Sequence, residues 1–277
     1  MKQMLKVLKK NKIYLSGGFG NILFQLIHYL SLRNEGLKPV FIDTLTKQNV
    51  ITNFFGWKIH DRIYLEVFKD LEIVVQKQSI LKTALVMVLG KISQRLKTPV
   101  CSIYFFSDSF KDRYLTESKH FFGYFQSKRY LESNQKEIQQ IVKALQKRHL
   151  LNKSTSPYTA IHYRYGDSVW AKQHEDYYTA VKQNIQQNKD VIVLTDSKDR
   201  AKEFFKDLKV SSLKLMSNTP ILDFSYMLDA QELYCAPSTF SWWASHSMKK
   251  GTEAYFPKFL FNKLGFFGES IDINYLN

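Results

Sequence analysis

The hydrophobic and polar positions in the second half of the chain alternate between short apolar runs and amphipathic stretches. The apolar runs predict buried strands at residues 158–164, 191–195, 212–216, 232–235 and 253–257. Apolar positions three or four residues apart predict helices near residues 177–187, 198–208, 221–228 and 239–249. Strand and helix in strict succession indicate βαβ units, a mainly parallel sheet and right-handed crossovers.

The first half of the chain follows the same periods less regularly. Short strands are predicted at "KIYLS" (12–16) and "PVFID" (39–43), and a helix is predicted from Asn21 to Arg33. The polar stretch "LNKSTSPY" (151–158) separates the two halves. Because Ser, Thr, Asn and Pro cluster there between patterned regions, it predicts a domain border.

A helical stripe of apolar residues runs through "ILKTALVMVLGKISQRLK" (80–97). Its members are Ile80, Leu81, Ala84, Leu85, Val88, Leu89 and Ile92. Four cations lie alongside, at Lys82, Lys91, Arg95 and Lys97. Two interpretations stay open: the stripe packs on the helix's own domain, which is the commoner arrangement, or it rests on a membrane surface.

Length and composition limit the class of protein. With 277 residues, 44% hydrophobic and 15% aromatic, the chain can bury the cores of two ordinary domains or of one large one. Its two cysteines lack the spacing of a zinc site or a disulfide framework, which favours a reducing compartment. Lysines interrupt the first apolar residues and no long apolar window follows, so we expect no signal peptide and no transmembrane helix.

Ligands of open parallel sheets bind beyond the carboxyl ends of the strands, so the residues after each predicted strand are of most interest. In "AIHYRYGD", period-two alternation places His162 and Arg164 on one face, followed by Gly166 and Asp167. A guanidinium and an imidazole together suit a phosphate group. The alternative is a buried structural cluster in which Asp167 neutralises Arg164.

Two further strand ends carry polar side chains. Asp196 and Ser197 follow the strand at 191–195, either as helix caps or as hydrogen-bonding partners of a base or ribose. Ser238, Thr239 and Ser241 crowd the start of a helix. Free amide groups and hydroxyls there suit a phosphate, although such residues are usually caps.

A glycine-rich segment near the start of the chain lies between a predicted strand and a predicted helix. Its glycines are Gly17, Gly18 and Gly20. The dinucleotide fingerprint Gly-x-Gly-x-x-Gly fails because its third position is Leu23. We therefore expect a turn that lets the backbone approach a ligand, with Asn21 as the helix cap. Gln25 and His28 are expected on a different face of the helix from its inward apolar residues.

Two ligand-binding motifs are absent from the sequence. It has no Asp-x-Asp pair, which metal-assisted nucleotide-sugar transferases typically use to hold a divalent ion. It also has no Gly-x-x-x-x-Gly-Lys-Ser/Thr loop, which weighs against an ATPase or small-molecule kinase of that type. We expect no metal and no cofactor, and a leaving diphosphate would be stabilised by Arg164 and helix amide groups.

Several segments together resemble the bacterial α-1,2-fucosyltransferases of glycosyltransferase family 11. They are "GGFGNILFQ" (17–25), "GYFQSKRYLE" (123–132), "HYRYGD" (162–167), "LTDS" (194–197) and "NTPILDFSYMLDAQELYCAPSTFSWWA" (218–244). They occur in the family's order between residues 13 and 257. That order makes the resemblance more specific than any single motif.

The resemblance implies an α/β, GT-B-like fold of two facing Rossmann-like domains with mainly parallel sheets. Residues 1–152 would form the N-terminal, acceptor-side domain, and residues 153–277 the C-terminal domain that binds the nucleotide-sugar donor. The implied reaction is inverting, metal-independent transfer of L-fucose from GDP-β-L-fucose to a galactoside-type acceptor. The implied partners are the donor and an oligosaccharide or lipid-linked glycan of a bacterial surface.

The resemblance also implies roles for the residues at the strand ends. Arg164 matches the first arginine of the family segment, which is expected to contact the diphosphate, and His162 matches the family histidine. The residues expected to face the donor are Gly17, Gly18, Gly20, Asn21, Arg164, Asp196, Ser197, Ser238, Thr239 and Ser241. The proton of the acceptor hydroxyl would pass to Asp167 or His162, with Glu175 and Asp176 behind them.

Two departures from the family pattern concern the donor. Tyr165 stands where the family has a second arginine, and Ile22 and Leu23 stand where it has Gln-Met. Either another cation substitutes for the arginine, or the donor differs in its sugar or geometry. The alternative function is therefore a related glycosyltransferase with a different nucleotide-sugar donor.

Two other classes of protein stay open. A nucleic-acid-binding protein would explain the net charge of +15, but no zinc-finger, RNP-like or basic-zipper pattern occurs. An NAD-dependent oxidoreductase would use the glycine-rich segment and Asp43 at the end of the next strand. For the transferase we expect a cytoplasmic enzyme whose basic surface contacts the inner face of the membrane.

Overall fold

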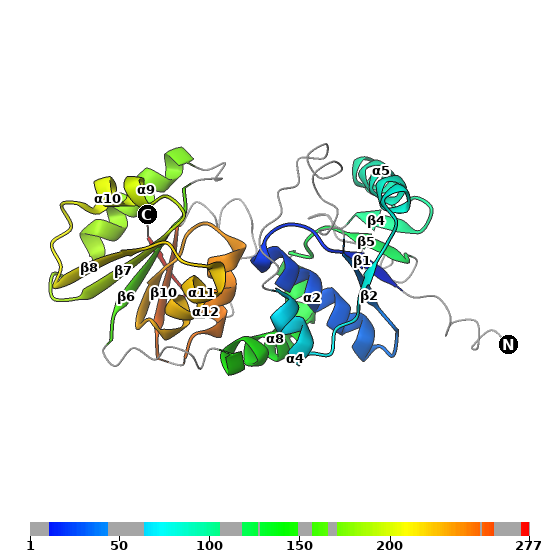
Figure 1. Ribbon diagram of the computed structural model, residues 1–277, viewed down its shortest axis with the longest axis horizontal. Coiled ribbons are helices and arrows are strands. Elements are labelled where there is room, and N and C mark those ends of the chain that lie inside the picture. The colour runs from blue at the N-terminus through cyan, green and yellow to red at the C-terminus, as the bar shows by residue number, and fades with distance from the viewer. Residues whose placement is uncertain are drawn as a thin grey trace. The chain divides into compact units, whose positions relative to one another are not determined.

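The computed structural model describes residues 11–43, 64–105, 118–126, 128–148, 157–165, 171–249, 251–257 and 273–276. The chain divides into two compact units, Met1–Ala144 and Leu145–Asn277, each with its own sheet and helices (Figure 1). The domain border predicted between residues 152 and 153 lies outside the described residues. None of the helices in the described ranges is long and apolar enough to cross a membrane.

The first unit contains a parallel sheet with the strand order β3-β2-β1-β5-β4. Its strands are β1 (Lys12–Tyr14), β2 (Val40–Asp43), β3 (Val75–Lys77), β4 (Ile103–Phe105) and β5 (His120–Phe122). The helices of this part of the chain are α2 (Phe19–Asn34), α4 (Tyr64–Asp70), α5 (Ile80–Leu96), α7 (Lys128–Ser133) and α8 (Gln135–Arg148). Strand order reverses between β1 and β5, which lie side by side.

Helix α2 is buried on nearly every side. Its apolar residues pack inward as predicted, and Gln25 and His28, expected on another face, are also buried. The His28 ring stacks on Phe125 and meets Phe121 edge-on, while its Nδ1 lies 2.8 Å from the Tyr130 hydroxyl. Burial lowers the pKa of His28 to about 3, so the core holds a neutral imidazole.

The second unit contains a parallel sheet with the strand order β11-β10-β9-β6-β7-β8. Its strands are β6 (Thr159–Tyr163), β7 (Asp190–Thr195), β8 (Ser212–Met216), β9 (Glu232–Tyr234), β10 (Glu253–Pro257) and β11 (Ile273–Leu276). Its helices are α9 (Ala171–Asn184), α10 (Lys198–Phe205), α11 (Pro220–Asp229) and α12 (Thr239–Ser247). The predicted alternation of strands and helices is confirmed, and with it the fold class of two Rossmann-like units with parallel sheets; β11 is an addition.

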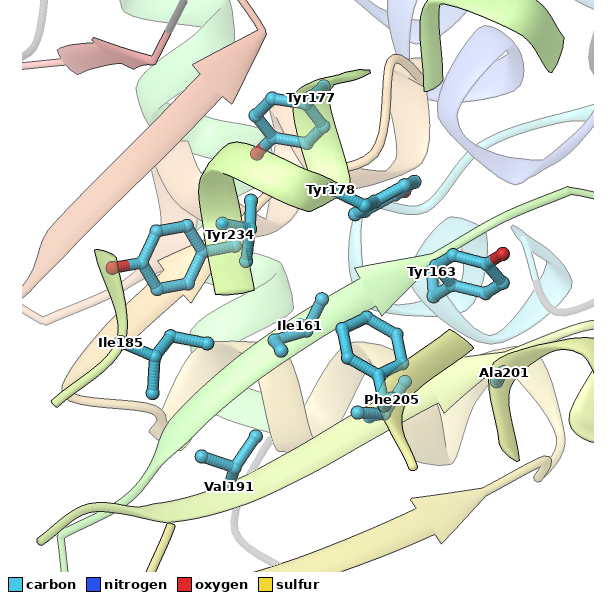
Figure 2. Close-up of a cluster of buried hydrophobic side chains, with 11 residues drawn as sticks. Ile161, Tyr163, Tyr177, Tyr178, Ile185, Val191, Ala201, Phe205 and Tyr234 are labelled. Atoms are coloured by element: carbon cyan, nitrogen blue, oxygen red, sulfur yellow. The ribbon is translucent and has the colours of Figure 1, made fainter. Parts of the chain in front are cut away.

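The two faces of β6 have different environments. On one face, Ile161 and Tyr163 pack in an aromatic core with Tyr178 of α9 and Phe205 of α10 (Figure 2). Because side chains alternate across a strand, His162 lies on the opposite face, where it contacts α12. The aromatic core therefore fixes which side of the sheet the predicted site residues occupy.

The buried imidazole of His28 predicts a dependence of stability on pH. Its pKa is about 3 in the folded chain, against 6.5 for an unperturbed histidine, so the unfolded chain binds more protons between these values. The contribution is fully present above pH 6.5 and is lost as the pH falls toward 3. His28→Phe should flatten the decline in unfolding free energy between about pH 6 and 4 by about 1.4 kcal/mol per pH unit.

The measurement is urea unfolding of the wild type and the variant across this pH range. Tyr130 keeps its hydrogen bond with Ser31, so the variant does not leave the Tyr130 hydroxyl without a hydrogen-bond partner. Equal slopes for the two proteins would contradict the prediction.

Candidate functional site

The strand order of the second sheet reverses between β6 and β9. From β6 the chain proceeds to β7 and β8 on one side, and β9, β10 and β11 continue on the other. Open parallel sheets bind ligands beyond the carboxyl ends of the strands at such a reversal. The residues that follow β6, β7 and β9 at this edge are Arg164, Tyr165, Asp196, Ser197, Ser238 and Thr239. The fold thus brings together predicted site residues that are far apart in the sequence.

Asp196 connects the ends of β6 and β7. Its Oδ1 accepts a hydrogen bond from the backbone amide of Tyr165 at 2.9 Å, and its Oδ2 lies 4.0 Å from Arg164 Nε. Ser197, not Asp196, occupies the N-cap position of α10, and its side chain makes no capping hydrogen bond. The side chain of Arg164 is 30% exposed, so a cation oriented by a carboxylate stays accessible at the edge of the sheet.

His162, Ser241 and Ser238 form a hydrogen-bonded row between β6 and the start of α12. His162 Nδ1 lies 2.5 Å from Ser241 Oγ, which lies 3.1 Å from Ser238 Oγ. Ser238 is the N-cap residue, and its hydroxyl accepts a hydrogen bond from the Ser241 amide at 3.2 Å. Ser241 is fully buried, whereas Ser238 and Thr239 are partly exposed. The Ser241 hydroxyl therefore faces the histidine, and its neighbours present the accessible polar groups.

The imidazole of His162 is neutral near pH 7. Burial, and after it the positive charge of Arg164, lower the pKa of His162 to about 3. So low a pKa makes the ring a weak acceptor of protons. This suits a group that holds Ser241 in place.

Tyr165, the residue that departs from the family pattern, contacts a cation. The guanidinium carbon of Arg200 lies 3.3 Å from the centre of the Tyr165 ring, and Arg200 Nη2 donates a hydrogen bond to the Tyr165 hydroxyl. Glu175 Oε1 accepts from both side chains at 3.0 Å. Sequence reasoning missed Arg200 because it belongs to no motif; its place four residues after Asp196 at a strand end was the available signal.

Asp223 in the first turn of α11 was also missed. Helix α11 follows the carboxyl end of β8, and Asn218 Nδ2 donates a hydrogen bond to Asp223 Oδ1 at 3.0 Å. Burial raises the pKa of Asp223 to about 6, against the smaller opposing effect of the hydrogen bonds from Asn218. A raised pKa at a residue that follows a strand end makes this carboxylate a candidate proton acceptor.

The glycine-rich segment follows β1, beside the strand-order reversal of the first sheet. The buried side chain of Gln25 holds it in place: Nε2 donates to Ser16 Oγ at 2.9 Å and to the Gly123 carbonyl at 3.0 Å. Helix α2 begins at Phe19 with Gly18 as N-cap. The prediction that Asn21 caps this helix is therefore wrong. Its Oδ1 accepts a hydrogen bond from Gln126 Nε2 at 3.0 Å, so it connects the first turn of α2 to the loop after β5.

Gly17 is the position in this segment that requires glycine. Its φ angle is +78°, in the left-handed region that L side chains rarely adopt. A Cβ atom there would lie 2.6 Å from Asn21 Nδ2 and 3.0 Å from Tyr124 Cε1. Gly18 is partly exposed at the helix start, and Gly20 is buried within the first turn of α2.

Some predicted site residues are not placed. Asp167 and Gly166 lie outside the described residues. Glu175 and Asp176 are exposed on α9, and Glu175 is engaged by Arg200. Within the described ranges, no group of three or more His, Cys, Asp or Glu side chains is arranged to hold a metal ion.

Comparisons with known proteins identify the fold. No protein-family model and no curated protein sequence matches the chain. Among solved structures, an E. coli heptosyltransferase, WaaC, with ADP matches with a TM-score of 0.50 and 10% identity, over 97% of this chain and 93% of the other. The fucosyltransferase NodZ from Bradyrhizobium matches with a TM-score of 0.37 and 16% identity, over 86% and 93%. The fold is that of the GT-B glycosyltransferases, as predicted.

The surroundings of Gly17 predict a selective effect of an added methyl group. Gly17→Ala should cost about 1 kcal/mol for the left-handed backbone and about 1–3 kcal/mol more for displacing Asn21 and Tyr124. Gly36 is the matched control, because it has the same φ of +78° with nothing within 4 Å of an added Cβ. Denaturant unfolding of both variants measures the difference. Equal losses of stability would contradict the close approach at Gly17.

Proposed function

We propose that the chain is an inverting glycosyltransferase related to family 11, which transfers L-fucose from GDP-β-L-fucose in α-1,2 linkage to a galactoside-type acceptor. The observation that carries the proposal is Arg164, a partly exposed cation whose Nε lies 4.0 Å from Asp196 Oδ2 at the strand-order reversal between β6 and β9. The heptosyltransferase with this fold was solved with ADP. A nucleoside diphosphate is also the leaving group that we propose here.

Departure of GDP places negative charge on the diphosphate in the transition state. Arg164 supplies a fixed positive charge for it. The first-turn amide groups of α12 and the partly exposed hydroxyls of Ser238 and Thr239 add hydrogen-bond donors. These groups perform the task without a metal ion.

The second cation of the diphosphate site is Arg200 in this proposal. The residue at the family's second arginine position is Tyr165, and Arg200 lies directly on its ring. Arg200 is 49% exposed and shares Glu175 with the Tyr165 hydroxyl, so the donor would have to compete with Glu175 for it. The position of Arg200 on the Tyr165 ring supports the interpretation that Arg200 replaces the second arginine of the family segment, and not the interpretation that the donor differs. A related nucleotide-sugar remains the alternative.

The acceptor hydroxyl must lose a proton during transfer. Because the pKa of His162 is only about 3, we assign this histidine to the support of Ser241. The proton acceptor is then Asp167, which lies outside the described residues, or Asp223, whose pKa of about 6 suits a base near neutral pH. Variants of both carboxylates distinguish them.

In this proposal the reaction takes place in the cytoplasm, where the nucleotide-sugar is available. The acceptor is an oligosaccharide or a lipid-linked glycan. The net charge of +15 supports contact with the anionic inner face of a bacterial membrane.

A donor panel tests the proposal. GDP-fucose, GDP-mannose, UDP-sugars and NAD are compared by thermal shift and by donor hydrolysis, with retention on DNA as a separate assay. We expect stabilisation and hydrolysis with GDP-fucose. Stabilisation by NAD alone, or salt-dependent retention on DNA without any response to a nucleotide-sugar, would contradict the transferase. A response to another nucleotide-sugar alone would exclude the fucosyl donor.

Arg164→Ala should lower the rate of transfer by about 10²–10³, the usual loss for one charge-stabilising donor, while the melting temperature stays unchanged. Arg200→Ala should raise KM for the donor severalfold. Lys202→Ala on the exposed side of α10 is the control and should leave both constants unchanged. Transfer at the wild-type rate by the Arg164 variant would contradict its assignment.

The raised pKa of Asp223 predicts that catalysis declines at acid pH. As the pH falls through about 6 the carboxylate becomes protonated, so kcat/KM should decline on the acid side. Asp223→Asn should lower kcat/KM by about 10²–10³. Asp207→Asn, which changes an exposed carboxylate just beyond the end of α10, is the control. If Asp223→Asn leaves the acid limb in place and Asp167→Asn removes transfer, the base is Asp167.

A further inference from the structure

The outer face of α5 is an exposed apolar stripe. Its side chains and their exposed fractions are Leu81 85%, Leu85 61%, Val88 45%, Ile92 41% and Leu96 62%. At 3.6 residues per turn these positions fall within an arc of roughly 80°. A contiguous apolar surface on a soluble protein indicates an interaction site, whereas single exposed apolar residues do not.

The opposite face of α5 attaches the helix to the first sheet. Its inward residues are Thr83, Val86, Met87, Gly90 and Ser93. A Cβ atom on Gly90 would lie 3.2 Å from the ring of Phe122, and Ser93 Oγ accepts a hydrogen bond from the Phe105 amide at 3.2 Å. These contacts fix the rotation of the helix. The predicted stripe is therefore divided. Leu89 packs with Val86 and Met87 on the core of the first sheet, whereas Leu81, Leu85, Val88 and Ile92 are exposed on the outer face.

Cations flank the stripe on both sides, and α5 contains no acidic residue. In helical projection Lys82 lies on one flank, and Lys91 and Arg95 lie on the other. Lys12 Nζ donates a hydrogen bond to Gln78 Oε1 at 3.4 Å, two residues before the first residue of α5, so a further ammonium group lies beside the start of the helix.

We propose that the outer face of α5 is a docking surface for an anionic lipid bilayer. The apolar stripe enters the boundary between headgroups and acyl chains, and the flanking lysine and arginine side chains extend to lipid phosphates. A second copy of this chain fits less well, because a two-fold contact across α5 would bring the two sets of cations together. The inference does not rest on the transferase activity.

Vesicle co-sedimentation of the full chain tests the surface. Equimolar phosphatidylcholine and phosphatidylglycerol should bind the wild type, and pure phosphatidylcholine should bind it weakly. Leu81→Gln/Leu85→Gln/Ile92→Gln should weaken binding by at least about tenfold. Lys82→Gln/Lys91→Gln/Arg95→Gln should remove the preference for phosphatidylglycerol, as should high salt. All six positions lie outside the packed face, so urea unfolding should be unchanged.

Ile221→Gln is the control, because Ile221 is a 43% exposed apolar residue of the second unit. It should bind vesicles like the wild type. Equal binding by the wild type and the apolar triple variant would overturn the proposal. So would a wild type that ignores vesicles and forms a dimer that the apolar substitutions dissociate. Binding of GDP in a thermal-shift assay is scored separately, so a failed transferase assignment and a failed docking surface give different results.

Discussion

The hydrogen bond between His162 and Ser241 connects the end of β6 to the first turn of α12, and the rest of the candidate site depends on this connection. Both residues are buried, so a broken contact would leave polar groups without water at a cost of about 1–3 kcal/mol. Arg164 follows His162 by two residues in the chain. Ser241 lies in the first turn of α12, whose backbone amide groups are the donors proposed for the ligand. This buried bond therefore adds to the pairing of β6 with β9 in fixing the cation and the helix start that we assign to the same ligand.

Gln25 has the corresponding task in the first sheet. Its buried amide group bonds to the segment after β1 and to the carbonyl of Gly123 after β5, so two loops at the strand-order reversal are held by one side chain. Each sheet thus uses a buried polar side chain to fix the backbone where a ligand would bind. Gln25 makes hydrogen bonds through both atoms of its amide group, and His162 makes one through Nδ1, which offsets the cost of burying these side chains.

The alternation of strands and helices was predictable because the apolar periods of β6 to β10 and their helices are short-range properties. The locations of Arg164, Asp196 and Ser238 at one edge also followed, since the carboxyl ends of parallel strands meet there. The hydrogen-bond partners of the site residues could not be predicted from the sequence. That Asp196 binds the Tyr165 amide, and that Asn21 binds Gln126, depends on which loops become neighbours, and no local pattern encodes that.

The same reasoning changes the meaning of the departures from the family pattern. Ile22 and Leu23 are fully buried in α2, so their side chains belong to the core of the first unit. Tyr165 is partly exposed at the strand end, with Arg200 on its ring and Glu175 at its hydroxyl. In the proposed transferase, the choice of donor would therefore depend on Tyr165 and on the charged side chains of Arg200 and Glu175 that contact it.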